Sequence, residues 1–188
     1  MLAVAVAERT THRVEIDGIA RELPLFEVAP GLSIAVFNLL GDTEIVEASA
    51  RGLARVLQGV EHDVLVTAET KSVPLVYELA RVLDTPWVVL RKSYKPYMGE
   101  TITATTDSIT TGHTQTLHLD EKDLPVVAGR RAILVDDVIT TGSTLDGMRS
   151  VVESAGGAVV AEAAVFTEGE DVDTEGIVSL GHLPLFRA

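Results

Sequence analysis

One stretch of the sequence brings together residue types that could bind a sugar phosphate. The segment Ile133–Leu145 reads ILVDDVITTGSTL: a hydrophobic strand, two adjacent acids, a Thr- and Gly-rich turn and the start of a helix. A helix N-terminus exposes backbone N–H groups that bind anions, and ligands of open α/β sheets bind beyond the carboxyl ends of strands. Gly142 lets the backbone curl around a phosphate, and four neighbours add hydroxyl donors: Thr140, Thr141, Ser143 and Thr144.

The two acids of this stretch, Asp136 and Asp137, extend the prediction to a ribose 5-phosphate site. Carboxylates repel phosphate, but they accept hydrogen bonds from the neighbouring hydroxyls of a ribose. A capped helix after a strand would explain either half of the segment alone. It gives no reason for two acids at the end of a buried strand. The segment lacks both the GKS/GKT of a Walker A loop and the GxGxxG dinucleotide fingerprint.

Other candidate residues carry weaker signals. Arg91 and Lys92 follow a buried strand, and a place at the carboxyl end of a strand favours an anion site over the alternative of a surface ion pair. Phe26 and Phe37 could stack on a base, although each is more simply explained as a core residue. The five His residues lack the spacing of metal ligands.

The charge balance limits the expected partners. The chain has 15 Lys and Arg against 28 Asp and Glu, a formal net charge of −13. Because an acidic surface repels phosphate backbones, we expect neither nucleic acid nor an anionic membrane as a partner. A polyphosphate would need backbone amides, a few placed cations and a metal ion. The sequence has no Cys, no apolar run long enough to span a membrane and no signal peptide, so we expect it in the cytoplasm.

The elements around these residues alternate between strand and helix patterns. Buried strands are predicted at Asp63–Thr67, Trp87–Leu90, Ala132–Val135 and Ala158–Phe166. Helices are predicted at Thr43–Gln58, after Ser72 with that residue as the N-cap, and at Leu145–Ala155. Strands separated by helices predict an α/β fold, in which an open, mainly parallel twisted sheet has helices on both faces.

Two regions depart from this alternation. The long polar segment Lys92–Ser108 is typical of a mobile lid, and its return through Thr101–Asp107, followed by His113–Leu119, predicts an antiparallel ribbon. We expect residues 1–42 to form a small N-terminal cap, or hood. Residues 43–188 are expected to form the core domain, with the lid at 92–108 and a C-terminal tail that contributes to the cap.

The segment ILVDDVITTGSTL resembles the phosphoribosyl-pyrophosphate motif of type I phosphoribosyltransferases. In element order the resemblance extends over residues 63–166. It is closest to the adenine/xanthine branch, through ETKS at Glu69–Ser72, VVLRK at Val88–Lys92 and SITTG before the ribbon. The tail LPLF at Leu183–Phe186 is similar to that of adenine phosphoribosyltransferases. The resemblance implies the type I phosphoribosyltransferase fold and an enzyme of purine salvage.

The resemblance also implies a role for particular residues. Asp136 and Asp137 would hold the ribose hydroxyls and take part in catalysis, while the 5-phosphate would be held by Thr140, Thr141, Gly142, Ser143 and Thr144. The pyrophosphate would be held by Glu69, Thr70, Lys71, Ser72, Arg91, Lys92 and, in the closed lid, Lys95. Val138, Ile139 and Phe26 would contact the base. Glu100 in the lid would assist proton transfer; a solvated loop acid is the alternative for Glu100, and a solvated lysine for Lys95.

The implied reaction joins a purine nitrogen to C1 of phosphoribosyl pyrophosphate and releases pyrophosphate, with adenine as the favoured base and AMP as the product. The resemblance implies a homodimer and Mg²⁺ carried by phosphoribosyl pyrophosphate, with Asp136 and Asp137 as its candidate protein ligands. Two alternatives stay open: a transferase for xanthine or orotate, and a non-catalytic regulator that senses phosphoribosyl pyrophosphate and binds DNA or RNA. The net charge of −13, the lack of a basic helix and the short segment before Val14 favour the enzyme.

Overall fold

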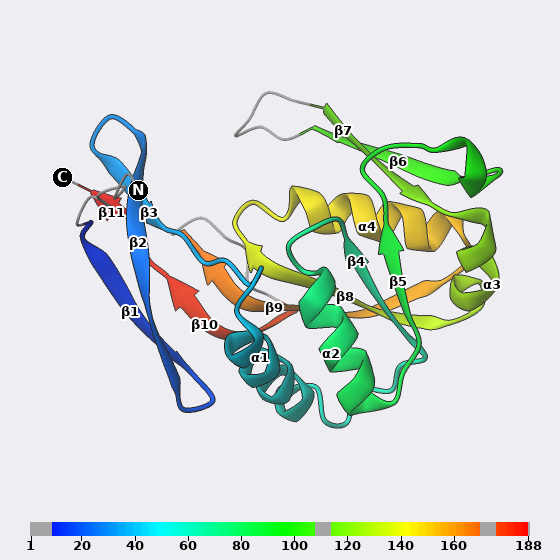
Figure 1. Ribbon diagram of the computed structural model, residues 1–188. Helices are drawn as coiled ribbons and strands as arrows, with labels where there is room; N and C mark the ends of the chain where they lie inside the picture. The colour runs from blue at the N-terminus through cyan, green and yellow to red at the C-terminus, as the bar shows by residue number, and fades with distance from the viewer. Residues whose placement is uncertain (1–8, 108–113, 170–175, 188) are drawn as a thin grey trace, which may run out of the picture.

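The computed structural model describes residues 9–107, 114–169 and 176–187, and a five-stranded parallel sheet forms the centre of this part of the chain (Figure 1). The strands lie in the order β10-β9-β8-β4-β5. Their bounds are β4 (Val64–Ala68), β5 (Trp87–Leu90), β8 (Arg131–Ile139), β9 (Ala158–Glu168) and β10 (Ile177–Leu183). The four predicted strands are confirmed, but β8 is longer than predicted, because it continues through both acids to Ile139.

Helices cover both faces of this sheet, which confirms the predicted α/β fold (Figure 1). Helices α1 (Thr43–Val56) and α2 (Val73–Leu83) pack on one face, and α4 (Ser143–Ser154) packs on the other. Successive residues of β4 alternate between the two cores, with Leu65 facing α1 and α2 and Val66 facing α4. Because both faces are buried, these strands are near-continuous hydrophobic runs. Short helical turns η1 (Pro96–Met98), η2 (Glu121–Asp123) and α3 (Leu124–Val127) connect the remaining elements.

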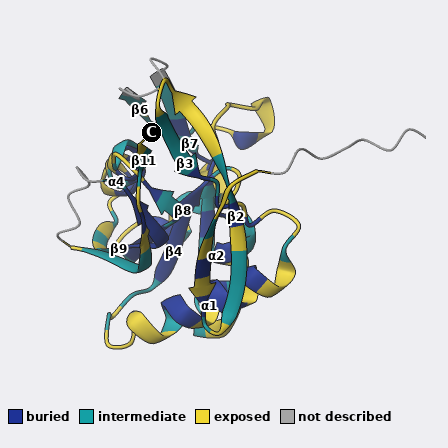
Figure 2. Cartoon of the chain, turned by 90° about the vertical axis from the view of Figure 1, so that its left-hand side faces the viewer, coloured by how far each residue is buried: buried dark blue, intermediate teal, exposed yellow. Residues whose placement is uncertain are grey.

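A second, antiparallel sheet stands beside the core, and we call it the hood. It contains β1 (Thr11–Ile16), β2 (Ile19–Ala29), β3 (Leu32–Ala35) and β11 (Phe186–Arg187), in that order. Phe186 pairs with Ser33, so residues from both ends of the chain meet in the hood. Figure 2 shows that β2 is mostly exposed or half-buried, while the core strands behind it are buried.

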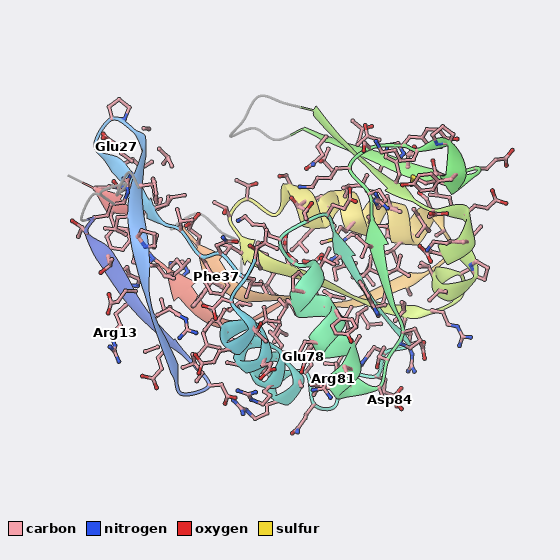
Figure 3. All side chains as sticks on the ribbon, in the orientation of Figure 1. Arg13, Glu27, Phe37, Glu78, Arg81 and Asp84 are labelled. Carbon is pink, nitrogen blue, oxygen red and sulfur yellow. The ribbon has the colours of Figure 1, made fainter. Side chains whose placement is uncertain are left out.

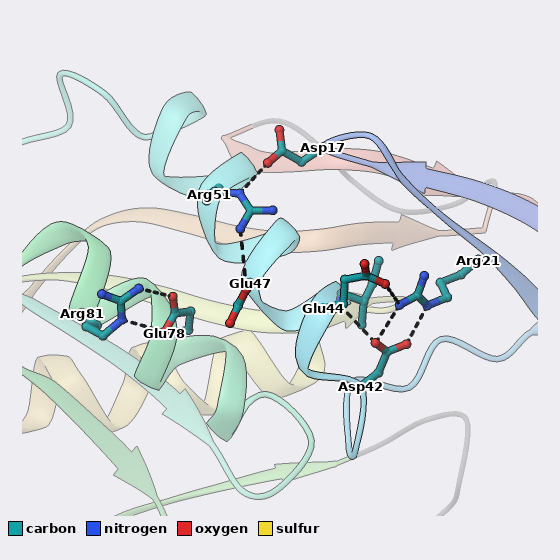
Figure 4. Close-up of polar contacts among 9 residues, drawn as sticks. Asp17, Arg21, Asp42, Glu44, Glu47, Arg51, Glu78 and Arg81 are labelled. Atoms are coloured by element: carbon teal, nitrogen blue, oxygen red, sulfur yellow. Dashed lines mark hydrogen bonds and ion pairs between the residues drawn. The ribbon is translucent and has the colours of Figure 1, made fainter.

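The hood is fastened to α1 by ion pairs and to the sheet by an aromatic contact. Arg21 donates to both oxygens of Asp42, at 2.7 and 2.9 Å, and Asp17 accepts from Arg51 and Arg55 on α1 (Figure 4). Phe37, in the segment that leads from the hood into the core, packs edge to face against Phe166 of β9, with the two ring centroids 4.9 Å apart (Figure 3). Polar pairs at the rim and an aromatic pair in the core therefore set the position of the hood.

The predicted antiparallel ribbon is confirmed as β6 (Ile102–Asp107) paired with β7 (Thr114–Leu119). It crosses α4 at Gly147, where an added Cβ would lie 2.3 Å from Cγ2 of Thr106, so a larger residue would require the Thr106 side chain to shift. Ser108, His113 and the SITTG segment at 108–112 lie outside the described residues. Among the helices of the described ranges, none is long and apolar enough to cross a membrane.

Candidate active site

The two acids of β8 are held by the turn that follows β4. Ser72 Oγ donates to Asp136 Oδ1 at 2.7 Å and accepts from the backbone N–H of Asp137 at 2.9 Å. Lys71 Nζ lies 3.3 Å from Asp137 Oδ2. The prediction that Ser72 caps α2 with its side chain is wrong, because the Ser72 hydroxyl turns to the acids and makes no cap hydrogen bond to α2. Thus a hydroxyl that the sequence assigned to a helix end instead joins the ends of two strands.

Burial makes the Asp136 carboxyl hold its proton more strongly than a solvent-exposed aspartate does. Desolvation, followed by the charge of Asp137, raises the pKa of Asp136 to about 7, and the hydrogen bond from Ser72 opposes that rise. Asp137 is itself 6% exposed. A carboxyl with a raised pKa at the carboxyl end of a parallel strand, as at Asp136, is typical of a functional site rather than of a stabilising core.

The loop between β8 and α4 has the form of an anion site. Gly142 adopts φ 75° as the N-cap of α4 and has no side chain to cap this end, and the backbone N–H of Ser143 donates a long hydrogen bond to Thr141 Oγ1 at 3.5 Å. The first-turn N–H groups after Ser143 are therefore available to a ligand, where the helix dipole favours negative charge. A cavity of about 180 Å³ opens here, lined by Asp136, Val138, Ile139, Thr140, Thr141, Gly142, Ser143, Thr144 and Leu145. We call residues Thr140–Thr144, which were predicted to bind the 5-phosphate, the phosphate loop. The phosphate loop, the predicted base contacts Val138 and Ile139, and Asp136 thus line one cavity.

The structure also joins the predicted pyrophosphate residues at the ends of β4 and β5. The Glu69 carboxylate accepts from the backbone N–H of Lys92 at 2.9 Å and forms an ion pair with Arg91. The Glu69–Thr70 peptide bond is cis. Because Lys71 and Ser72 of the same turn contact the acids of β8, this turn and the phosphate loop lie on the same edge of the sheet.

Three predicted site residues are not brought to this edge by their described contacts. The backbone N–H of Glu100 donates to Glu121 at 2.9 Å, and the adjoining turn that begins after Lys95 is anchored by the fully buried Met98. This loop lies beside α3, at the end of α4 opposite the phosphate loop (Figure 1). Phe26 lies on the hood, 38% exposed, with the Arg9 guanidinium 4.1 Å from its ring centroid.

Glu168, the last residue of β9, is a further candidate that was not predicted from the sequence. Only 6% of Glu168 is exposed, and its Oε2 accepts from Thr140 Oγ1 of the phosphate loop at 3.2 Å. Burial raises the pKa of Glu168, while the Thr140 hydrogen bond and the charges of Lys71 and His182 act in the opposite direction. The signal was present in the sequence, since an acid at the end of a buried strand was the same pattern that identified Asp136 and Asp137.

Comparison with known proteins places this geometry in a family. A family model described as "Phosphoribosyl transferase domain" matches residues 40–175. Adenine phosphoribosyltransferase of Clostridium botulinum (strain Alaska E43 / Type E3) is 31% identical over 167 residues, which cover 88% of each chain. The solved structure of adenine phosphoribosyltransferase from Thermoanaerobacter pseudethanolicus matches with a TM-score of 0.67 at 23% identity, covering 92% of this chain and 95% of that chain. That last likeness shows the shared fold.

A regulator is also similar. The purine biosynthesis transcriptional repressor PurR of Bacillus subtilis (strain 168) is 30% identical over 146 residues, which cover 78% of this chain and 50% of PurR. The chain therefore spans about half the length of that relative.

The family match, which includes the whole of β8, the phosphate loop and α4, confirms the resemblance seen at Ile133–Leu145. This chain belongs to the phosphoribosyl transferase domain family.

Proposed function

We propose that this chain transfers ribose 5-phosphate from phosphoribosyl pyrophosphate to a purine base, with adenine as the base and AMP and pyrophosphate as products. One observation carries the proposal: the N-terminus of α4 and Asp136 line one cavity, and a second polar turn at residues 69–72 contacts both Asp136 and Asp137. Two anion sites separated by hydroxyl acceptors match a sugar with phosphate at one end and pyrophosphate at the other. The similarity to adenine phosphoribosyltransferases over 88% of the chain supports adenine.

Each part of the donor has a proposed place. The 5-phosphate binds the loop Thr140–Thr144 through backbone N–H groups and hydroxyls, and the ribose hydroxyls donate to Asp136 and Asp137. The pyrophosphate binds the turn Glu69–Ser72, with Lys71, Arg91 and Lys92 supplying positive charge. These local devices let an acidic protein bind a polyanion.

Magnesium fits this site as part of the substrate. The described residues contain no group of three or more His, Cys, Asp or Glu that could hold a metal alone. Mg²⁺ commonly binds through one or two carboxylates plus substrate phosphates, and Asp136 and Asp137 offer two carboxylates. When bound, Mg²⁺ would neutralise the leaving pyrophosphate.

The proposed chemistry is a substitution at C1 of the ribose. The C1–O bond breaks with its electron pair passing to pyrophosphate, and a purine nitrogen lone pair forms the new bond. Positive charge develops on the ribose ring as the bond breaks, as in glycoside cleavage. The purine nitrogen loses its proton as the new bond forms, and we propose the Glu100 carboxylate as the acceptor of that proton. This role would require the loop held by buried Met98 and by the bond to Glu121 to move.

The organisation of the whole protein is part of the proposal. We propose that residues 1–42, together with the C-terminal strand, act as a hood over the base, and that residues 43–188 form the catalytic core with a lid at 92–108. We further propose that the chain acts in the cytoplasm, because the proposed substrates are phosphorylated metabolites. We also propose that it forms a homodimer, as the family resemblance implies. Sedimentation velocity with and without phosphoribosyl pyrophosphate tests the dimer; a monomer under both conditions contradicts it.

A regulator that binds phosphoribosyl pyrophosphate without turnover is the second candidate. The match to PurR over 78% of this chain favours it, because the sugar-phosphate site lies within a region that such a protein would share. The net charge of −13 opposes binding of this chain to nucleic acid.

Pyrophosphate release distinguishes the two candidates. Purified protein with Mg²⁺ and phosphoribosyl pyrophosphate is assayed against adenine, guanine, hypoxanthine, xanthine and orotate. We expect release with adenine that needs both substrates and is lost in Asp136→Asn/Asp137→Asn. If no base is turned over while calorimetry shows tight binding of phosphoribosyl pyrophosphate, the enzyme is excluded and the regulator is favoured.

A further inference from the structure

Glu168 lies beside the phosphate loop and has no role in the proposed reaction. Strand β9 runs parallel to β8 with Ile139 opposite Thr167, so Glu168 lies beside the first residue of the phosphate loop. Its Oε2 accepts from Thr140 Oγ1 at 3.2 Å. Glu168 is only 6% exposed, and the polar and charged neighbours of its carboxylate are Thr140, Lys71 and His182.

The side chain of Glu168 points to the hood side of the sheet. Phe166, two residues earlier, packs in the core that contains α1 and the hood strands, and it meets Phe37 at 4.9 Å. Val138, opposite Phe166 in the register, belongs to the same core. Val165 belongs to this core as well, so the side chains at the end of β9 do not alternate strictly between the two faces. We place Glu168 on the hood side because Lys71 is among its charged neighbours and leads into α2, which packs on that face.

The strand order places Glu168 across the ribose from the pyrophosphate. The acids that would hold the ribose lie on β8, the central strand of β10-β9-β8-β4-β5. The pyrophosphate turn follows β4 on one side of β8, and Glu168 ends β9 on the other side. In a substitution at C1, an in-line nucleophile approaches opposite the leaving group. The base therefore enters from the side of β9 and the hood, where Glu168 is the buried acid at the end of its strand.

We infer that Glu168 is a specificity-determining residue whose carboxylate accepts a hydrogen bond from the exocyclic amino group of the base. The inference rests on the proposed function and deepens it. A carboxylate only accepts hydrogen bonds, so it attracts the 6-amino group of adenine and repels the 6-oxo group of hypoxanthine. A donor on the base would also compensate the desolvation that raises the pKa of this carboxyl. The competing explanation is a positioning role, in which Glu168 only holds Thr140 in the phosphate loop.

Nucleotide binding separates these explanations without requiring turnover. Calorimetry measures the affinity of AMP, IMP and purine riboside 5′-monophosphate, which lacks any 6-substituent, for wild type, Glu168→Gln and Thr140→Val. We expect Glu168→Gln to weaken AMP about ten-fold, as for loss of one charged hydrogen bond. The purine riboside nucleotide should change by less than about two-fold, and IMP should bind equally or more tightly, since repulsion of its oxygen is removed. Thr140→Val should weaken all three nucleotides alike, because it acts on the phosphate loop that they share.

Further variants and outcomes complete the test. Glu168→Asp keeps the charge one methylene further away, so AMP should bind more weakly while remaining preferred over IMP. Thermal melts establish that each variant folds. Equal weakening of all three nucleotides in Glu168→Gln, as in Thr140→Val, would overturn the inference in favour of positioning; unchanged AMP preference or absent AMP binding also overturns it. A protein that prefers AMP through Glu168 but releases no pyrophosphate would keep this inference and lose the proposed transferase activity.

Discussion

The phosphate loop and the hood are built in opposite ways. The loop draws its cavity lining from one strand–loop–helix unit, from Asp136 to Leu145. The hood combines β1, β2 and β3 with β11 from the other end of the chain, and its attachment depends on pairs such as Arg21 with Asp42 and Phe37 with Phe166. A site made of neighbouring residues can be recognised from a sequence, whereas a site made of distant ones depends on the packing that joins them.

This difference bears directly on what each region does. A 5-phosphate is the same in every phosphoribosyl donor, so one loop of backbone amides would suffice to bind it in the proposed reaction. The identity of the base is expected to depend on groups from the hood side, including Glu168 at the end of β9. Changes in the hood should therefore alter stability and base choice, while changes in the loop should alter binding of the sugar phosphate.

Breaking the aromatic contact between hood and core should have the largest effect. Phe37→Ala is expected to lower the free energy of unfolding by about 3–5 kcal/mol, because it removes a buried aromatic ring and leaves a cavity. Urea denaturation measures this change. Phe26→Ala, on the half-exposed hood surface, is the matched control and should cost less than about 1.5 kcal/mol. Equal losses in the two variants would show that Phe37 does not fasten the hood.

Removing the two acids should affect the loop region without affecting the fold. In Asp136→Asn/Asp137→Asn, phosphoribosyl pyrophosphate is expected to bind at least about 100-fold more weakly, since two charged acceptors for the ribose hydroxyls are lost. Calorimetry measures affinity, and circular dichroism follows the melt. Glu153→Gln, an exposed acid at the far end of α4, serves as the control and should leave the affinity unchanged. Unchanged binding in the double variant would refute the ribose assignment.

The raised pKa of Asp136 predicts how stability depends on pH. The pKa of Asp136 is about 7 in the folded chain and about 3.9 in an unfolded one. Between these values the folded chain holds a proton that the unfolded chain releases, so stability falls as pH rises from about 4 to about 7 and levels off above that. Relative to Asp136→Asn, wild type should lose at least about 1.4 kcal/mol across this window, the equivalent of one pKa unit. Urea titrations at a series of pH values measure the difference; a difference that does not vary with pH excludes the shift.

Removing the Ser72 hydroxyl should have the smallest effect and should act through the acids. Ser72→Ala is expected to cost about 1 kcal/mol, the usual net contribution of a hydrogen bond. It should also move the pH-dependent step of wild type to higher pH, because the bond from Ser72 lowers the pKa of Asp136. Ser150→Ala on the exposed side of α4 is the control. In this variant neither the size nor the midpoint pH of the pH-dependent change in unfolding free energy should differ from wild type. A midpoint that stays in place in Ser72→Ala would contradict the contact between the turn and β8.

Much of the core could be predicted from the sequence because its signals are local. Buried strands such as Trp87–Leu90 and the helix predicted at Thr43–Gln58 follow from hydrophobic periodicity, and both are confirmed, with the helix ending at Val56. Ser72 is the N-cap residue of α2, as predicted, but its side chain does not make the expected cap hydrogen bond. Locally it has the type and place of an N-cap, but the acids that draw its hydroxyl away are 64 residues or more further along the chain. Glu100 was placed in the lid by its position in the sequence, whereas the loop that carries it is anchored by the burial of Met98.

The sequence alone determined the phosphate loop, the two acids beside it and the parallel sheet that carries them, because short-range patterns of burial, turn and helix start specify all three. Tertiary structure decided which turn would hold those acids, that β11 would complete the hood, and that Glu168 would border the phosphate loop from the next strand. The physical reason is that burial and hydrogen bonding depend on which strands pack side by side. Neither the pKa of Asp136 nor the surroundings of a bound base can be read from residues that are neighbours only in the chain.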